Sequence, residues 1–214
     1  MIRRERVLID GPGGKLEVAL EVPAQPTGIV LIGHPHPLFG GTPDNKVVTT
    51  LARTFTGHGC ISLRPAFRGV AGSSGVHDEG IGETDDLHCI LAWARARFDP
   101  AGVLPVYLAG FSFGAYVVTR LAKRLAAGGQ PARWLVLVGT AAGHVEGARH
   151  YETETVAPGT LVIHGNLDTT VPLANVLAWA EPLELPVVVV PGADHFFHRK
   201  LHILRDVVQR AWPS

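Results

Sequence analysis

Cysteine is scarce in this chain, which has only two among its 214 residues, Cys60 and Cys89. Both lie inside apolar segments, so we expect buried thiols in a reducing compartment rather than a disulfide framework. An excess of charge of either sign is also lacking, because 19 lysines and arginines balance 19 aspartates and glutamates. This balance predicts no nucleic-acid partner and no general attraction to anionic lipids or strongly charged substrates.

Long apolar runs are missing as well. No segment approaches the roughly 18 uninterrupted apolar residues of a membrane span, and none follows the charged cluster at residues 3–6. We therefore expect a soluble, cytoplasmic protein with no membrane partner. The length suits one domain over residues 1–214, large enough to bury a core without disulfide or metal crosslinks.

Apolar, strand-like runs alternate with helical patterns along most of the chain. This alternation predicts an α/β fold with a mostly parallel sheet of about eight strands and helices on both faces. Residues 6–23 differ, because two short apolar runs flank a Gly-Pro-Gly-Gly turn and so predict an N-terminal antiparallel hairpin. The last amphipathic pattern predicts a helix over residues 196–212.

A serine lies on the bend between the apolar run 106–110 and the helical pattern that follows it. It is flanked by glycine two positions away on each side, in the order Gly110-Phe-Ser112-Phe-Gly114. The pattern G-x-S-x-G between a strand and a helix is typical of a nucleophile elbow, which exposes the serine hydroxyl at the carboxyl edge of the sheet. Such a sequence can also be only a turn, but the flanking elements favour a nucleophile.

A serine nucleophile needs a base to take its proton and an acid to orient that base. Asp168 follows one strand-like run and His195 follows the next, which gives the chain order Ser, Asp, His expected for this architecture. Asp194 is a second candidate for the acid. Because it adjoins His195 in the chain, its bond to that imidazole would be awkward, so we favour Asp168.

Acyl transfer also needs backbone N–H groups that bind the oxyanion. Phe113, immediately after the serine, is expected to supply one. The loop that begins at residue 34 should supply the other, and His36 is the first available donor there because the prolines on either side of it have no N–H. Leu38 is the alternative, and the loop can also be read as a rigid turn without a binding role.

Three segments together resemble the α/β-hydrolase superfamily: Gly110 to Gly114, His164-Gly-Asn-Leu-Asp168, and Gly192-Ala-Asp-His195. Residues 34–48 and 63–86 resemble a group of small bacterial predicted hydrolases, similar to dienelactone hydrolase and short-chain carboxylesterases. The resemblance implies a serine hydrolase that acts on a small-molecule ester without a cofactor. Many relatives have His-Gly where this chain has His34-Pro35, so the assignment of His36 rests on its position alone.

The site is expected to be open. Residues 142–159, where such proteins often insert a lid, form a polar segment too short for a cap domain with its own core. Nearby loop aromatics, Phe39, Phe113 and Phe196, are expected to line a modest pocket that suits small or short-acyl substrates. These phenylalanines can equally be ordinary core residues, and the same holds for Phe197 beside Phe196.

Other chemistry is less well supported. His198 and His202 have helical spacing, but Arg199 stands where zinc peptidases of the H-E-x-x-H type have glutamate, so no catalytic metal is expected. The glycine-rich segment 67–80 lacks the lysine of a phosphate-binding loop and is read as structural. The same three residues would also serve an acyl thioesterase or another acyl hydrolase. A ligand-binding module on a hydrolase scaffold is the alternative from another class, and a homodimer is compatible with either.

Overall fold

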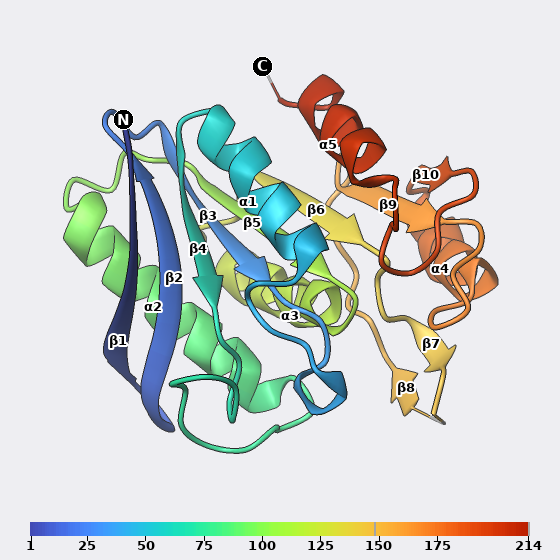
Figure 1. The fold of residues 1–214 in the computed structure, drawn as a ribbon, viewed down its shortest axis with the longest axis horizontal. Coiled ribbons are helices and arrows are strands. Elements are labelled where there is room, and N and C mark those ends of the chain that lie inside the picture. Colours follow the sequence, from blue (N-terminus) through green and yellow to red (C-terminus); the bar gives the residue numbers. More distant parts are fainter. Residues whose placement is uncertain (148, 214) are drawn as a thin grey trace.

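The computed structural model describes residues 1–147 and 149–213, and an eight-stranded sheet forms its centre (Figure 1). The strand order across the sheet is β1-β2-β4-β3-β5-β6-β9-β10. The strands are β1 (Ile2–Gly11), β2 (Gly14–Pro23), β3 (Gly28–Gly33), β4 (Cys60–Pro65), β5 (Val106–Phe111), β6 (Trp134–Val138), β9 (Leu161–Gly165) and β10 (Val187–Val190).

The predicted N-terminal hairpin is present. Strands β1 and β2 pair antiparallel along their whole length, closing at Gly11 and Gly14, and β2 is also antiparallel to β4. From β4 to β10 every neighbouring pair is parallel. The chain therefore has the α/β-hydrolase fold that its sequence predicts.

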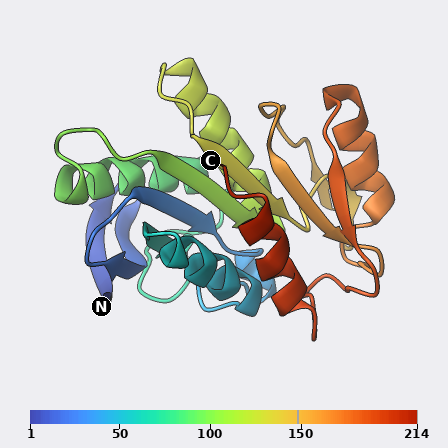
Figure 2. The same ribbon diagram turned by 90° about the horizontal axis from the view of Figure 1, so that it is seen from above.

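Helices cover both faces of the sheet (Figure 2). The helices α1 and α5 pack on one face, whereas α2, α3 and α4 pack on the other. Their bounds are α1 (Lys46–Gly57), α2 (Ile81–Phe98), α3 (Phe113–Ala127), α4 (Leu173–Ala180) and α5 (Leu201–Arg210), with short 3-10 helices η1 (Pro37–Phe39) and η2 (Glu181–Leu183). Within residues 1–147 and 149–213, no helix is long and apolar enough to cross a membrane.

The central strands are apolar along their length because both of their faces are buried. In β3, Ile29 and Leu31 pack under the helices of one face, and Val30 and Ile32 pack under those of the other. The same alternation runs through β5 and β6. It follows the two-residue repeat of a strand and divides the core into two layers.

The functional edge lies where β3 and β5 run side by side. They are paired in parallel, with Gly33 opposite Gly110. After β3 the chain turns to β4 on one side, whereas the chain after β5 continues to β6 on the other side. The two loops leaving β3 and β5 are thus directed apart at the carboxyl edge, which is where open α/β sheets form their binding crevice.

Residues 142–159 contain a small hairpin that the sequence did not predict. It consists of β7 (Gly143–Val145) and β8 (Arg149–Tyr151), paired antiparallel and separate from the main sheet. The side chain of Asn175, in α4, donates hydrogen bonds to the carbonyls of Ala142 and His144. The segment is therefore fixed against α4, although it forms no cap domain.

The last helix begins at Leu201 rather than at 196, so this part of the predicted helix is wrong. Phe197 and Arg199 both have positive φ, at 52° and 60°, which a helix does not allow. Phe197 is fully buried although it lies in a turn. Its apolar character therefore extended the helical pattern beyond the helix itself.

Candidate functional site

Ser112 occupies a sharp bend between β5 and α3. Its backbone has φ 56° and ψ −121°, a conformation that costs free energy for any residue other than glycine. A side chain at Gly114 would place its Cβ 2.3 Å from the backbone of Gly33, and one at Gly110 would meet the Gly114 carbonyl at 2.5 Å. The two glycines of the motif are therefore required by backbone packing, which holds the serine at the strand end.

A chain of hydrogen bonds runs from this serine. The hydroxyl of Ser112 lies 3.0 Å from Nε2 of His195, and Nδ1 of the same imidazole lies 2.7 Å from Oδ2 of Asp168. All three residues are largely buried, with exposed fractions of 8% for Ser112, 5% for His195 and 7% for Asp168. Because the carboxylate can only accept, Nδ1 carries the proton, and Nε2 is left to accept from the serine.

The loop after β9 holds the Asp168 carboxylate in place. Its Oδ1 accepts the backbone N–H groups of Thr170 and Val171 at 3.0 and 2.8 Å. Nε2 of His164 lies 3.3 Å from Oδ2 and 2.9 Å from the carbonyl of Val171. Both oxygens of the carboxylate thus have contacts that fix its orientation toward His195.

Asp194, the competing acid, has a different partner. Its carboxylate accepts the backbone N–H of His198 at 3.0 Å and lies 2.6 Å from Nδ1 of the same residue. Both side chains are exposed to solvent. Within the described part of the chain, no group of three or more histidine, cysteine, aspartate or glutamate side chains is placed to hold a metal ion.

The two predicted oxyanion donors lie on neighbouring loops. Phe113 is the first residue of α3, and the first N–H groups of a helix have no acceptor within the helix. His36 is buried in the loop after β3, and its ring packs 4.9 Å from that of Phe113. The N–H of Leu38, the alternative donor, instead donates to Nδ1 of His36 at 3.3 Å. The geometry therefore favours His36 over Leu38.

His34 stabilises this loop. Its Nδ1 donates to the carbonyl of Pro35 at 2.6 Å, and its Nε2 accepts the N–H of Phe67 at 2.9 Å. The residue is fully buried, and burial lowers its pKa to about 4. A neutral His34 thus connects the loop after β3 to the loop after β4.

Comparison with known proteins places this geometry in a family. The sequence profile of the serine hydrolase (FSH1) family matches residues 103–206. An α/β serine hydrolase without lid from Xanthomonas campestris is 36% identical, with a TM-score of 0.85 over 98% of this chain and 93% of that one. A serine hydrolase homologue from Coxiella burnetii is 37% identical, with a TM-score of 0.84 over 98% and 97%. The chain belongs to the α/β serine hydrolases.

A more distant likeness concerns the fold alone. Dienelactone hydrolase from Anabaena variabilis is 18% identical to this hydrolase, with a TM-score of 0.72 over 98% of this chain and 96% of that one. The family resemblance predicted from the sequence motifs is confirmed by these comparisons.

The serine of this hydrolase opens into a small pocket of about 80 Å³. The pocket is formed where the loops after β3, β5, β9 and β10 meet, together with the β7–β8 hairpin. Its lining consists of Pro35, His36, Phe39, Gly40, Gly41, Asn45, Ser112, Arg149, Thr170, His195 and Phe196.

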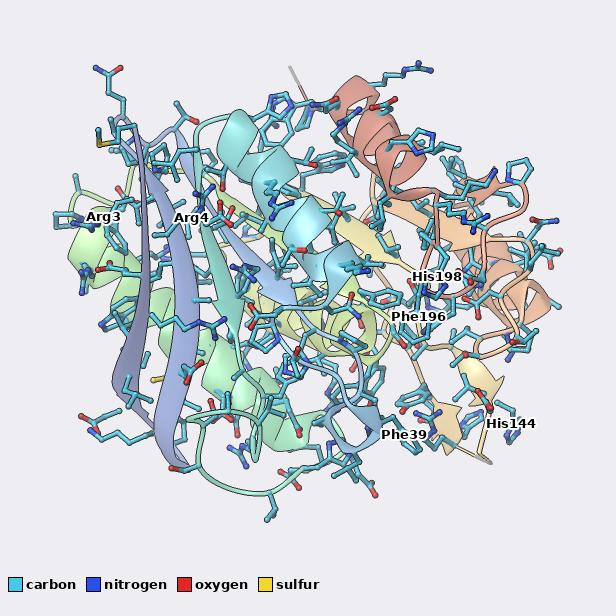
Figure 3. All side chains as sticks on the ribbon, in the orientation of Figure 1. Arg3, Arg4, Phe39, His144, Phe196 and His198 are labelled. Carbon is cyan, nitrogen blue, oxygen red and sulfur yellow. The ribbon has the colours of Figure 1, made fainter. Side chains whose placement is uncertain are left out.

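Two of the three predicted aromatic residues lie at this pocket. Phe39 and Phe196 are 67% and 44% exposed and come from different loops of the same edge (Figure 3). The ring of Phe196 packs against His195, with centroids 5.1 Å apart. Phe113, by contrast, buries its ring almost completely, so its predicted place in the lining is wrong and only its backbone is available to the site.

Sequence reasoning missed Asn45, Arg149 and Thr170, which also line the pocket. Each lies in a polar segment where asparagine, arginine or threonine is common on any surface. No motif marks them, and their proximity depends on how distant loops fold together.

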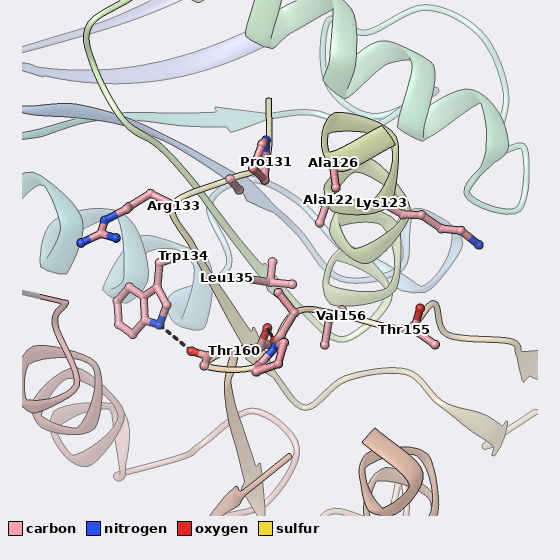
Figure 4. Close-up of a pocket in the computed structure, with 14 residues that line it drawn as sticks. Ala122, Lys123, Ala126, Pro131, Arg133, Trp134, Leu135, Thr155, Val156 and Thr160 are labelled. Carbon is pink, nitrogen blue, oxygen red and sulfur yellow. Dashed lines mark hydrogen bonds between the residues drawn. The ribbon is translucent and has the colours of Figure 1, made fainter. Parts of the chain in front are cut away.

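A separate pocket of about 210 Å³ lies at the opposite edge of the sheet, between α3, the start of β6 and residues 155–160 (Figure 4). Trp134 lines it and donates from Nε1 to the carbonyl of Gly159 at 3.1 Å. Ser112 and His195 are not among its described lining residues. Ser112 and His195 thus open into the pocket at the carboxyl edge and not into this one.

Proposed function

We propose that this hydrolase cleaves small or short-acyl carboxylic esters through an acyl-enzyme intermediate on Ser112. The observation that most supports the proposal is the hydrogen-bonded series from Ser112 through His195 to Asp168, at 3.0 and 2.7 Å. A hydroxyl becomes a useful nucleophile only when a base so placed removes its proton. The membership of a serine hydrolase family agrees with this chemistry.

In the first half of the reaction, the Ser112 oxygen attacks the ester carbonyl while Nε2 of His195 accepts its proton. The imidazolium that forms is stabilised by the Asp168 carboxylate. The N–H groups of Phe113 and His36 would donate to the oxyanion, and the N-terminus of α3 adds a favourable dipole. Nε2 then donates its proton to the departing alcohol oxygen, which leaves an acyl group on Ser112.

In the second half, water replaces the alcohol. His195 accepts a proton from this water as it attacks the acyl carbonyl, and the same backbone donors bind the second oxyanion. Collapse of the intermediate returns the proton to Ser112 and releases the carboxylic acid. No step needs a group beyond the chain itself and water.

The size of the pocket supports small substrates. The cavity beside Ser112 measures about 80 Å³, less than the several hundred Å³ typical of sites for drug-sized ligands. The β7–β8 hairpin contributes Arg149 to the rim but has strands of only three residues each. It offers little surface to cover a long acyl chain.

The decisive experiment compares the wild type with Ser112→Ala on p-nitrophenyl acetate and butyrate. Removal of the nucleophile is expected to lower turnover by roughly 10⁶-fold, with an unchanged circular dichroism spectrum. The wild type should also react with a fluorophosphonate probe, whereas Ser112→Ala should not. Acyl thioesters in the same panel test the thioesterase alternative.

His195→Gln provides a second test, with His202→Gln as its matched control. His202 is an exposed histidine of α5, away from the bonded series. We expect loss of activity only for the variant at 195. Retention of more than a tenth of wild-type activity by Ser112→Ala would assign the nucleophile elsewhere, and a wild type that neither labels nor turns over esters would favour a non-catalytic ligand-binding protein.

A further inference from the structure

A second pocket adjoins the one at Ser112. It measures about 240 Å³ and shares two lining residues, His36 and Arg149, with the pocket that opens on the serine. Its lining consists of His36, His77, Glu79, Tyr116, Arg149, His150 and Tyr151. Part of a substrate held at Ser112 can therefore extend into a space whose walls are mainly polar.

Arg149 supplies the fixed positive charge between the two pockets. Its guanidinium lies 4.2 Å from the centre of the Phe39 ring, and its Nε and Nη2 donate to the carbonyl of Glu146 at 3.0 and 2.8 Å. No carboxylate of the described residues lies within 4 Å of this guanidinium, whereas the half-buried Arg68 and Arg120 both have such a partner. The aromatic contact and the carbonyl hold the cation in place without neutralising it.

His36 and Tyr151, beside Arg149, add no negative charge to this pocket. Burial, together with the nearby His77 and Arg149, lowers the pKa of His36 to about 4. Burial also raises the pKa of Tyr151, so that its hydroxyl stays neutral and can donate a hydrogen bond. Arg149 is thus the one permanent cation among the described lining residues, and it lies among hydroxyl and imidazole groups that can form hydrogen bonds.

Glu79 limits the charge that this pocket accepts. It is the carboxylate among the described lining residues, and it is exposed to solvent at the pocket's edge. One guanidinium opposed by one carboxylate suits a single negative charge better than a doubly charged phosphate. A planar carboxylate also matches the planar donor edge of arginine.

We propose that this pocket is a subsite for a carboxylate carried by the substrate, bound by Arg149. The preferred substrates are then esters in which either the acid part or the alcohol part ends in a carboxylate. The inference rests on the proposed esterase function, which it makes more specific. It does not conflict with the balanced overall charge, because the attraction is local to one residue.

The test uses matched pairs of charged and neutral esters. Monoethyl glutarate is compared with ethyl pentanoate for a charge on the acid side, and 4-acetoxybenzoate with its methyl ester for a charge on the alcohol side. The quantity measured is the ratio of kcat/KM for the charged ester to that for the neutral one. Comparing this ratio between variants cancels the intrinsic reactivity of each ester.

Arg149→Gln is expected to lower this ratio by roughly ten- to a hundredfold on at least one pair, the range expected for a hydrogen bond to a charged group. Arg149→Lys should keep an intermediate ratio, because it retains the charge but not the planar edge. Arg97→Gln is the matched control, since Arg97 also lies over aromatic rings, those of Trp93 and Phe98, but far from the site. It should keep the wild-type ratio.

A binding measurement on the inactive Ser112→Ala variant separates this inference from the proposed function. Monoethyl glutarate is titrated calorimetrically into Ser112→Ala and into two double variants that also carry Arg149→Lys or Arg149→Gln. This comparison measures binding at the subsite alone. We expect at least tenfold weaker binding without the arginine. If Ser112-dependent esterase activity is found but neither the binding nor the kcat/KM ratio depends on Arg149, the subsite is wrong. If Ser112→Ala remains active while binding depends on Arg149, the proposed function is wrong and the subsite stands.

Discussion

His164 and Asp168 meet inside the protein, with Nε2 of the imidazole 3.3 Å from Oδ2 of the carboxylate. His164 is fully buried, and burial lowers its pKa. Its Nε2–H also lies 2.9 Å from the carbonyl of Val171, in the loop that follows the aspartate. One neutral histidine therefore ties β9 both to the acid and to the loop that carries it.

Removing this donor is expected to disturb the acid without changing substrate contacts. His164→Leu should lower kcat by about tenfold with little change in KM, and should cost about 1–3 kcal/mol of stability because the Val171 carbonyl loses its partner. His164→Gln retains an N–H donor and should therefore keep more of the activity and more of the stability than His164→Leu. Steady-state kinetics and urea unfolding measure these effects. Equal loss in both variants would indicate that the size of the ring, rather than its hydrogen bonds, is what matters.

The two aspartates near His195 should differ sharply. Asp168→Asn is expected to lower kcat by roughly 10⁴-fold, because the amide can no longer stabilise the charged imidazole or fix its tautomer. Asp194→Asn should leave at least half of the activity, since Asp194 bonds to the exposed His198. Ester hydrolysis by both variants is the measurement. The opposite ranking would transfer the acid's role to Asp194.

Stability is expected to fall in mild acid partly because of His34. Its pKa is about 4 in the folded protein, whereas an unfolded chain takes up the proton near pH 6.5. Between these values the unfolded state binds more protons than the folded state, so the free energy of unfolding decreases as the pH falls from about 6.5 to 4. The full difference corresponds to on the order of 3 kcal/mol.

This pH effect can be isolated with His34→Gln. The variant should unfold in urea with a free energy that changes less between pH 7 and pH 4.5 than that of the wild type. The difference between the two pH values is the readout, so an overall loss of stability in the variant does not obscure it. An identical pH dependence in both proteins would show that folding does not lower the pKa of His34.

The nucleophile bend should not tolerate a methyl group at Gly114. A Cβ there would lie 2.3 Å from the Gly33 backbone, which cannot move without displacing β3. Gly114→Ala is expected to cost about 1–3 kcal/mol or more and to lower activity with it. Gly128→Ala is the control, because a Cβ at that position meets the Leu125 carbonyl at an ordinary 3.5 Å. Thermal unfolding that leaves both variants at the wild-type midpoint would contradict the close packing of β3 and α3.

The open site predicts a preference for short acyl groups. Methylene groups beyond the small pocket would stay in water and gain little of the roughly 0.8 kcal/mol that burial of each provides. We expect kcat/KM for p-nitrophenyl esters to peak between acetyl and butyryl and to flatten or fall by octanoyl. A steady rise through twelve carbons, measured below the micelle threshold and with monomeric protein, would reveal an apolar channel.

Much of the fold could be predicted from the sequence because buried parallel strands are apolar throughout and end at glycine or polar residues. The run that became β5 ends beside Ser112, and the runs that became β9 and β10 end shortly before Asp168 and His195. Strands that are parallel bring their carboxyl ends to one edge. The G-x-S-x-G pattern and the positions of Asp168 and His195 just after strand-like runs were therefore enough to predict that these three side chains meet.

Other features depend on contacts between distant segments. Phe197 fills the core from outside the last helix. The periodicity of apolar residues in the sequence cannot distinguish such a residue from a buried residue of the helix. The β7–β8 hairpin has strands of three residues, too short for a clear alternation of polar and apolar side chains. The approach of Arg149 to Phe39 joins residues 110 positions apart, and no local pattern encodes it.

The β7–β8 hairpin is hydrogen-bonded to α4 and to the loop after β9, but it takes no part in the main sheet. The main-sheet strands that end beside Ser112 and before Asp168 and His195 pair without this hairpin, whereas the loop that carries Asp168 is bonded to it through Thr170. We therefore expect a change in the hairpin to alter the pocket at Arg149 while the pairing of the main sheet stays in place. Exchanging residues 143–151 between members of the family is thus expected to change which esters the protein accepts without unfolding the main sheet.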